Sequence, residues 1–198
     1  MAGPHENLEH AEHAEHAAHS GNKKIALLIA VIALFLAFSE TLGKSAQTAA
    51  ISDNVEASNL WAFFQAKTIR QTTLRIAAEQ VQIVADTSDN QAAKAAMQKA
   101  IDGWKKTVAR YEDEPDTGEG RKQLSHRAKE AEEKQHIALA RYHHYEVASA
   151  AFQIGIVLAS ATIITGMMVL SWLAAGLAVA GLAFMGIGFF APLAVHLV

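Results

Sequence analysis

Hydrophobic residues are concentrated in two parts of the chain, and a long polar stretch separates them. The first apolar segment covers residues 25–42: it is unbroken over residues 25–38 and becomes more polar at Ser39, Glu40 and Thr41. A second apolar region covers residues 147–198, with no Asp, Glu, Lys or Arg after Glu146. A helix needs about 20 mostly apolar residues to cross a bilayer. The first run therefore predicts one crossing, and the second region, which is too long for one, predicts two.

The pattern also gives expected boundaries for these membrane segments. We place the first crossing at residues 23–42 and a transmembrane helical hairpin at residues 147–198. Within the hairpin, the crossings are expected at about 148–170 and 174–195, with a tight turn near Trp172.

Positive charges lie on both sides of the first crossing, so they do not fix its orientation. Lys23 and Lys24 favour an inside N-terminus, whereas Lys44, Lys134 and Arg141 flank the crossings on the other side. The positive-inside rule weakens for connections longer than about 60 residues. The balance slightly favours a cytoplasmic position for the middle region.

The pattern of the middle region, residues 43–146, is helical and predicts three helices at about 53–85, 89–112 and 121–146, the last of which could run without a break into the second crossing. Asp53 is expected to cap the first helix at its N-terminus. Apolar residues recur every seven positions in this helix, and a second row lies beside them. The apolar arc is wider than a two-stranded coiled-coil seam and favours packing against two or more helices. The first row is Val55, Ala62, Ile69, Ile76 and Ile83, and the second is Leu60, Leu74 and Val81.

Helix lengths constrain how these three helices can stack. At a rise of 1.5 Å per residue, the acidic loop at residues 112–120 would have to climb about 25 Å in an upright three-helix bundle. We therefore expect the second helix to tilt outward or the first to bend. The expected fold class is all-α: an integral membrane protein with three transmembrane helices and a helical, coiled-coil-like soluble domain between the first and second.

Small residues recur at a spacing of four in the predicted hairpin, and such residues let helix backbones approach closely in lipid. Together with the wide apolar arc, they predict helix packing and a homo-oligomer. The residues expected to pack helices or copies of the chain are Val55, Trp61, Phe63, Phe64, Ile69, Ile76, Ile83, Gly155, Ala159, Gly176 and Ala180.

Residues 1–22 are rich in histidine and glutamate and are expected to form a disordered tail. Imidazole and carboxylate groups together suit divalent transition metals, and histidines change charge near neutral pH. The tail could sense metal or pH, or it could be a polar tail that binds metal only weakly and adventitiously, which we favour. The candidate metal ligands are His10, His13, His16 and His19.

Residues 53–70 (DNVEASNLWAFFQAKTIR) resemble the signature of a bacterial membrane-protein family catalogued as domain of unknown function 4337. The layout is similar as well, with one early crossing, a helical middle and a C-terminal hairpin. The resemblance covers nearly the whole chain except the histidine-rich tail. It implies a multi-pass protein of the bacterial inner (cytoplasmic) membrane, and it brings no known activity, cofactor or catalytic residue.

The same stretch places aromatic residues beside two cations, Lys67 and Arg70. Aromatic rings beside cations could bind an anionic partner. The other interpretation is core packing with a charged rim, and we favour it.

Other features make an enzyme the least expected class. The chain has no cysteine, which excludes disulfides and cysteine-based metal centres. The net charge of -3 does not favour nucleic acid as a partner. Glu133 and His136 form the only Glu-x-x-His pair, whereas di-iron helix bundles use that pair twice. No catalytic residue and no cofactor site is therefore assigned.

The leading expectation is a non-enzymatic, self-associating scaffold or interaction protein embedded in the lipid bilayer. One alternative is a channel or transport accessory subunit whose hairpin helices line a path. The polar residues available for such a path are Gln153, Ser160, Thr162 and Thr165. The other alternative is metal or pH sensing through the histidine-rich tail.

Overall fold

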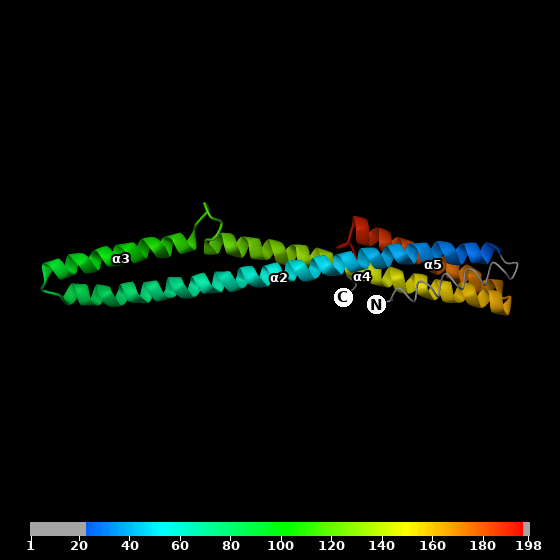
Figure 1. The fold of residues 1–198 in the computed structure, drawn as a ribbon, viewed down its shortest axis with the longest axis horizontal. Coiled ribbons are helices and arrows are strands. Elements are labelled where there is room, and N and C mark those ends of the chain that lie inside the picture. Colours follow the sequence, from blue (N-terminus) through cyan, green and yellow to red (C-terminus); the bar gives the residue numbers. More distant parts are fainter. Residues whose placement is uncertain (1–22, 196–198) are drawn as a thin grey trace. The chain divides into compact units, whose positions relative to one another are not determined.

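The structure is a computed structural model and describes residues 23–195. This part of the chain contains four α-helices and no β-strand, which confirms the expected all-α class. The chain divides into two units. We call Met1–Ile51 with Gln135–Val198 the apolar unit and Ser52–Lys134 the polar unit, and we describe each by itself. The helices are α2 (Lys23–Thr87), α3 (Gln91–Glu112), α4 (Arg121–Thr165) and α5 (Met168–Phe190) (Figure 1).

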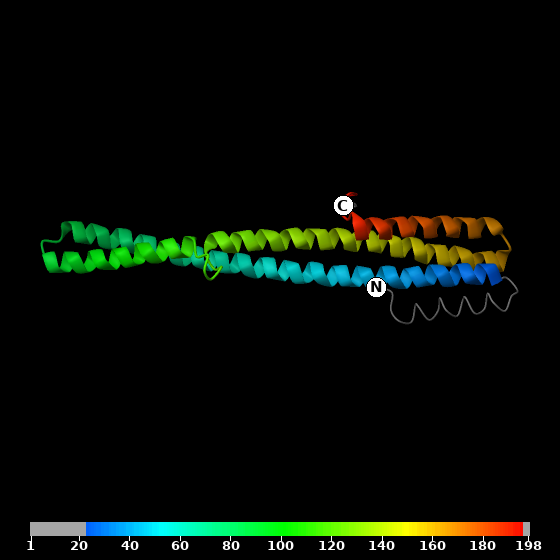
Figure 2. The same cartoon turned by 90° about the horizontal axis from the view of Figure 1, so that it is seen from above.

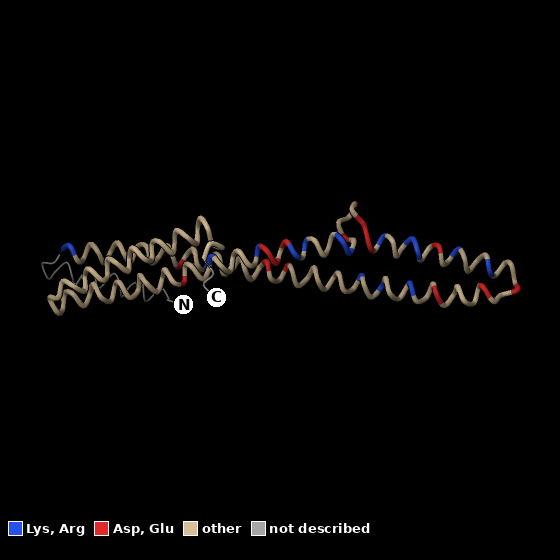
Figure 3. Tube along the Cα trace, turned by 180° about the vertical axis from the view of Figure 1, so that it is seen from behind, with Lys and Arg blue, Asp and Glu red and all other residues tan. Residues whose placement is uncertain are grey.

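Three helices, α2, α4 and α5, are long and apolar enough to cross a membrane. Figure 3 shows charged residues spread along the polar unit, whereas the helices of the apolar unit are almost free of them. Length and composition therefore agree with the three expected crossings and indicate a membrane protein.

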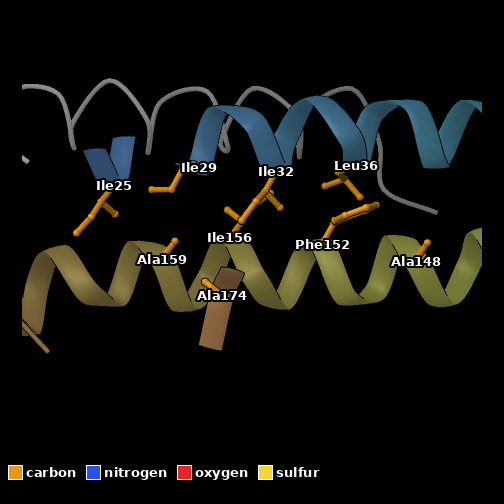
Figure 4. Packing of buried hydrophobic residues seen from close by; sticks show 9 residues of the cluster. All are labelled: Ile25, Ile29, Ile32, Leu36, Ala148, Phe152, Ile156, Ala159 and Ala174. Atoms are coloured by element: carbon orange, nitrogen blue, oxygen red, sulfur yellow. The ribbon is translucent and has the colours of Figure 1, made fainter. Parts of the chain in front are cut away.

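The core of the apolar unit lies between one face of α2 and one face of α4, with a contribution from α5 (Figure 4). The α2 residues in this core are spaced three or four apart, as one helix face requires. In lipid, such close packing holds helices together. The buried residues are Ile25, Ile29, Ile32 and Leu36 of α2, Ala148, Phe152, Ile156 and Ala159 of α4, and Ala174 of α5.

Glycine at position 181 allows α5 to approach α4 closely. A methyl group at Gly181 would lie 2.6–3.0 Å from three atoms of the Phe152 ring. That ring is fully buried and stacks on Phe35, with 6.2 Å between the ring centroids. Gly181 was not among the expected packing residues, because its spacing from Gly176 breaks the pattern of four.

The connection between α4 and α5 is only two residues long. Gly166 has a φ of +71°, and its N–H donates to the carbonyl of Thr162. This is a left-handed helix C-terminus, which glycine adopts without steric cost. The expected turn near Trp172 is therefore wrong, since Gly166 ends α4 earlier and Trp172 lies inside α5.

The α2 helix continues without interruption through Asp53, so the expected N-cap there is also wrong. Residues 44–102 contain neither glycine nor proline, the two residues that most disfavour a helix interior. Asp53 can cap a helix, but the residues before it also favour a helix, so α2 continues through it. The next boundary is a true cap, since Asn90 Oδ1 accepts hydrogen bonds from the N–H groups of Ala92 and Ala93.

In the polar unit, α3 and the start of α4 lie one after the other along α2 (Figures 1 and 2). At 1.5 Å per residue, the α2 segment 52–87 is about 54 Å long, α3 about 33 Å and the α4 segment 121–134 about 21 Å. The lengths match, so the acidic loop does not have to climb. The expectation of a strained bundle of three helices side by side is therefore wrong. Along its length, α2 pairs first with α4 and then with α3, one helix at a time.

Candidate functional site

One face of α2 in the polar unit carries large apolar side chains that residues 23–195 leave uncovered. Ile69 and Ile83 are 67% and 66% exposed, and Val55 and Ile76 are 52% and 49% exposed. Their spacing of seven residues places them, with the smaller Ala62, along one face of the helix. We call these five residues the exposed row.

The buried side of the same α2 segment is formed by other positions. Leu60 is buried and packs with Leu124 and Ala128 of α4. A single neighbouring helix covers only a narrow stripe of a wide apolar arc. In the second row of the sequence pattern Leu60 is buried and Leu74 and Val81 are half-buried, whereas the first row is exposed. The buried α2 positions of the polar unit are Ala57, Leu60, Lys67, Gln71, Ala78 and Ala85.

The aromatic residues at the family-like stretch have packing roles. The Trp61 indole N–H donates to Glu132 Oε1 over 2.7 Å. Its ring meets that of Phe64 edge to face, with 5.4 Å between centroids, and both rings pack against the buried leucines. Phe63 is partly exposed at 37%.

The positive charge of Lys67 is paired with carboxylates of the same chain. Its side chain is only 5% exposed, and Nζ donates to Glu114 Oε2 over 3.2 Å and lies 3.7 Å from Glu119 Oε2. The rings of Phe63 and Tyr111 lie 5.3 and 5.6 Å from the same nitrogen. This arrangement favours the interpretation of the cluster as packing around a charged group, because the ammonium already has two carboxylates.

A second polar layer lies one helical turn further along α2. Arg121 Nη1 donates to Gln71 Oε1 and to Glu112 Oε2, both over 2.7 Å. Gln71 Nε2 donates to Glu112 Oε2 over 3.0 Å and to the Val108 carbonyl over 3.2 Å. The Arg121 guanidinium also lies 4.7 Å from the centroid of the Phe64 ring.

These two layers fasten the acidic loop between α3 and α4 to α2 at both ends. The sequence reading missed Gln71, Glu112, Glu114 and Arg121. The sequence does contain a sign of these contacts. Lys67 and Gln71 are four residues apart on the same helix face as Leu60, where apolar residues would be expected. The acidic loop supplies carboxylates for that face.

Acid should weaken this attachment. The hydrogen bond from Gln71, and then the charge of Arg121, lower the pKa of Glu112 from its ordinary value of 4.5. A lowered folded-state pKa gives stability that is complete above that ordinary value and is lost as the pH falls through the folded pKa. We expect hydrogen exchange of the α3 amides to accelerate, relative to intrinsic rates, as the pH falls below 4.5.

The variant Glu112→Gln should reduce this acid sensitivity, because glutamine does not titrate. Glu79→Gln is the control, since Glu79 is an exposed carboxylate of α2. An equal reduction in both variants would show that Glu112 has no special role.

The small residues of the apolar unit divide into two groups. Gly155 and Ala159 are buried within the chain, and a methyl group at Gly155 would lie 3.4 Å from the Ala174 carbonyl oxygen. They pack helices of one chain. Gly176 is exposed, with nothing within 4 Å of an added methyl, and Ala180 is half-buried.

Two of the polar residues named for a path in the hairpin donate hydrogen bonds to carbonyls of their own helix. The Thr162 side chain is buried, and its hydroxyl donates to the Leu158 carbonyl of its own helix. Ser160 Oγ is buried without a hydrogen-bond partner in residues 23–195. Thr165 donates to the Ala161 carbonyl.

A polar cleft of about 530 Å³ opens between α2 and α4 in the apolar unit. Ser39 Oγ donates to the Tyr145 carbonyl over 2.9 Å and joins the two helices at this level. Gly43 permits the close approach, since its added methyl would lie 3.4 Å from Tyr145 Cβ. The side chains that give the cleft its polarity include Glu40, Lys44, Gln47, Tyr142, Glu146 and Gln153.

The candidate metal ligands His10, His13, His16 and His19 lie outside the residues that the structure describes. Within residues 23–195, no group of three or more His, Cys, Asp or Glu side chains is arranged to hold a metal ion.

A family model described as Domain of unknown function (DUF4337) matches residues 21–191, which include the stretch 53–70 and all four helices. No curated protein and no solved structure matches the chain.

Proposed function

Because this chain belongs to the family described as Domain of unknown function (DUF4337), whose name assigns no activity, we propose a function from its geometry. We propose that the protein is a non-enzymatic scaffold of the bacterial inner membrane that self-associates through the exposed row of α2. The apolar helices anchor it in the bilayer, and the polar unit presents the surface that assembles.

The exposed row is the observation that carries this proposal. Fully burying an isoleucine side chain stabilises by about 1.5–3 kcal/mol, and the row contains three isoleucines and a valine that are each about half exposed or more. A soluble helical surface gains little from such residues unless something covers them.

A second copy of the chain is the partner that fits the row best. Copies inserted in one membrane share one orientation, so identical rows can align in parallel and in register. A seven-residue repeat is the spacing at which parallel helices keep one seam in contact. Confinement to the same membrane also raises the effective concentration of the copies.

Disulfide trapping tests the proposal directly, because the natural chain has no cysteine. Full-length protein with Ile76→Cys should form cross-linked dimers in native membranes under mild oxidation, since parallel alignment brings position 76 of each copy together. Ala95→Cys, an exposed position on α3, is the matched control. Equal trapping at both positions, or none at Ile76, Ile69 and Ile83 alike, would contradict the proposal.

A further inference from the structure

We propose that the polar cleft between α2 and α4 binds the headgroup of a phospholipid that carries a primary ammonium group. The proposal concerns the apolar unit alone and is independent of the exposed row. Its evidence is the position of the cleft, the charges that line it and the hydrogen-bonding groups around them.

The cleft lies at the level where lipid headgroups are found. Glu40 follows the end of the apolar run 25–38 by two residues, and Glu146 is the last charged residue before the uninterrupted apolar region. Both line the cleft. Both apolar segments meet charged residues at this level, and we take these charged ends to mark the membrane–water boundary.

The charges in the cleft are largely unused. Glu40 and Lys44 are four residues apart on α2, a spacing that commonly gives an ion pair. In the part of the chain that the structure describes, neither has an ion-pair partner. Glu146 accepts a hydrogen bond from the Tyr142 hydroxyl over 3.4 Å and lies 3.7 Å from His143 Nδ1. The cleft thus presents charges of both signs that a ligand can pair.

A phosphate next to an ammonium complements this arrangement. The phosphate pairs with Lys44, and the ammonium pairs with Glu40 and Glu146. A headgroup without an ammonium would leave the two carboxylates without a cation. A primary ammonium has three N–H donors for carboxylate and amide oxygens, including those of Gln47 and Gln153, whereas a quaternary ammonium has none.

The cleft has a size suited to this ligand. Its volume of about 530 Å³ falls within the usual range of small-molecule sites. The lining helices are held at a fixed spacing by the Ser39–Tyr145 hydrogen bond and the contact of Gly43 with Tyr145. The site is therefore formed before the ligand arrives.

Lipid binding to the full-length protein, measured by native mass spectrometry after delipidation, tests the inference. The probes are phosphatidylethanolamine, phosphatidylcholine and phosphatidylglycerol with identical acyl chains. We expect phosphatidylethanolamine to bind about tenfold more tightly than either of the others, since only it makes charge-assisted hydrogen bonds to both carboxylates. Equal affinity for the three lipids would overturn the proposal.

Variants of the cleft residues and a soluble competitor test whether the lipid binds in the cleft. Glu40→Gln and Glu146→Gln should each lower the affinity for phosphatidylethanolamine towards that of phosphatidylcholine. Glu56→Gln, an exposed position of α2 outside the cleft, should leave it unchanged, and the same loss in this control would overturn the assignment. Displacement of the lipid by free phosphoethanolamine at micromolar concentration would assign the cleft to a soluble ligand instead.

Discussion

Replacing Glu114 with glutamine should loosen α3 from α2 by about 3 kcal/mol. The Lys67 ammonium stays buried, with its side chain 5% exposed, and loses its nearest carboxylate. Breaking a buried ion pair from one side costs roughly 3–5 kcal/mol, and the lower end applies because Glu119 remains 3.7 Å away. Since 1.36 kcal/mol corresponds to a factor of ten, hydrogen exchange of the α3 amides should become about 100-fold faster. The exchange is measured on full-length protein in detergent.

A double variant separates the buried charge from a general packing defect. Lys67→Met together with Glu114→Gln removes both charges and keeps side chains of similar length, so it should recover most of the lost protection. Arg70→Met, at an exposed position three residues along α2, should have little effect. If the double variant exchanges as fast as Glu114→Gln alone, the ion pair does not hold α3 in place.

Replacing Ile69 and Ile76 together with lysine should weaken self-association by at least about 100-fold. The change removes two apolar contacts of the proposed seam and places an ammonium where it would be desolvated. Both side chains are largely exposed in the single chain, 67% and 49%, so folding should be retained. Mass photometry over a dilution series in detergent gives the assembly state, and circular dichroism gives the helix content.

The charge-matched control for this experiment is Ala95→Lys together with Ala96→Lys. Both alanines are exposed on α3, away from the exposed row. The control should assemble as the natural chain does. Assembly of the Ile69→Lys/Ile76→Lys protein at natural strength would show that another surface joins the copies.

The long apolar helices and the polar helices could be predicted from the sequence because their signals are local. An apolar run such as residues 25–38 has few other structural solutions, and the cap region near Asn90 has polar residues suited to end one helix and begin another. Asp53 is a position at which the local pattern gave a wrong prediction. Its pattern is suited to a cap, yet no residue before it disfavours a helix, and α2 continues.

The charged layers could not be predicted for a different reason. Lys67 and Glu114 are 47 positions apart, and only the way α3 folds back along α2 brings them together. Sequence periodicity identified an apolar arc on α2, but not which part of it one neighbouring helix would cover. Residues such as Ile69 were expected to pack, and the structure of a single chain leaves them exposed.

The short connection at Gly166 and Met167 has a consequence for how the protein is made. With two residues between α4 and α5 and no charged residue after Glu146, almost no polar chain has to be carried across the bilayer at that point. Backbone groups in hydrocarbon must be satisfied within helices. In the proposed membrane arrangement, α4 and α5 should therefore leave the insertion machinery together, as a preformed pair.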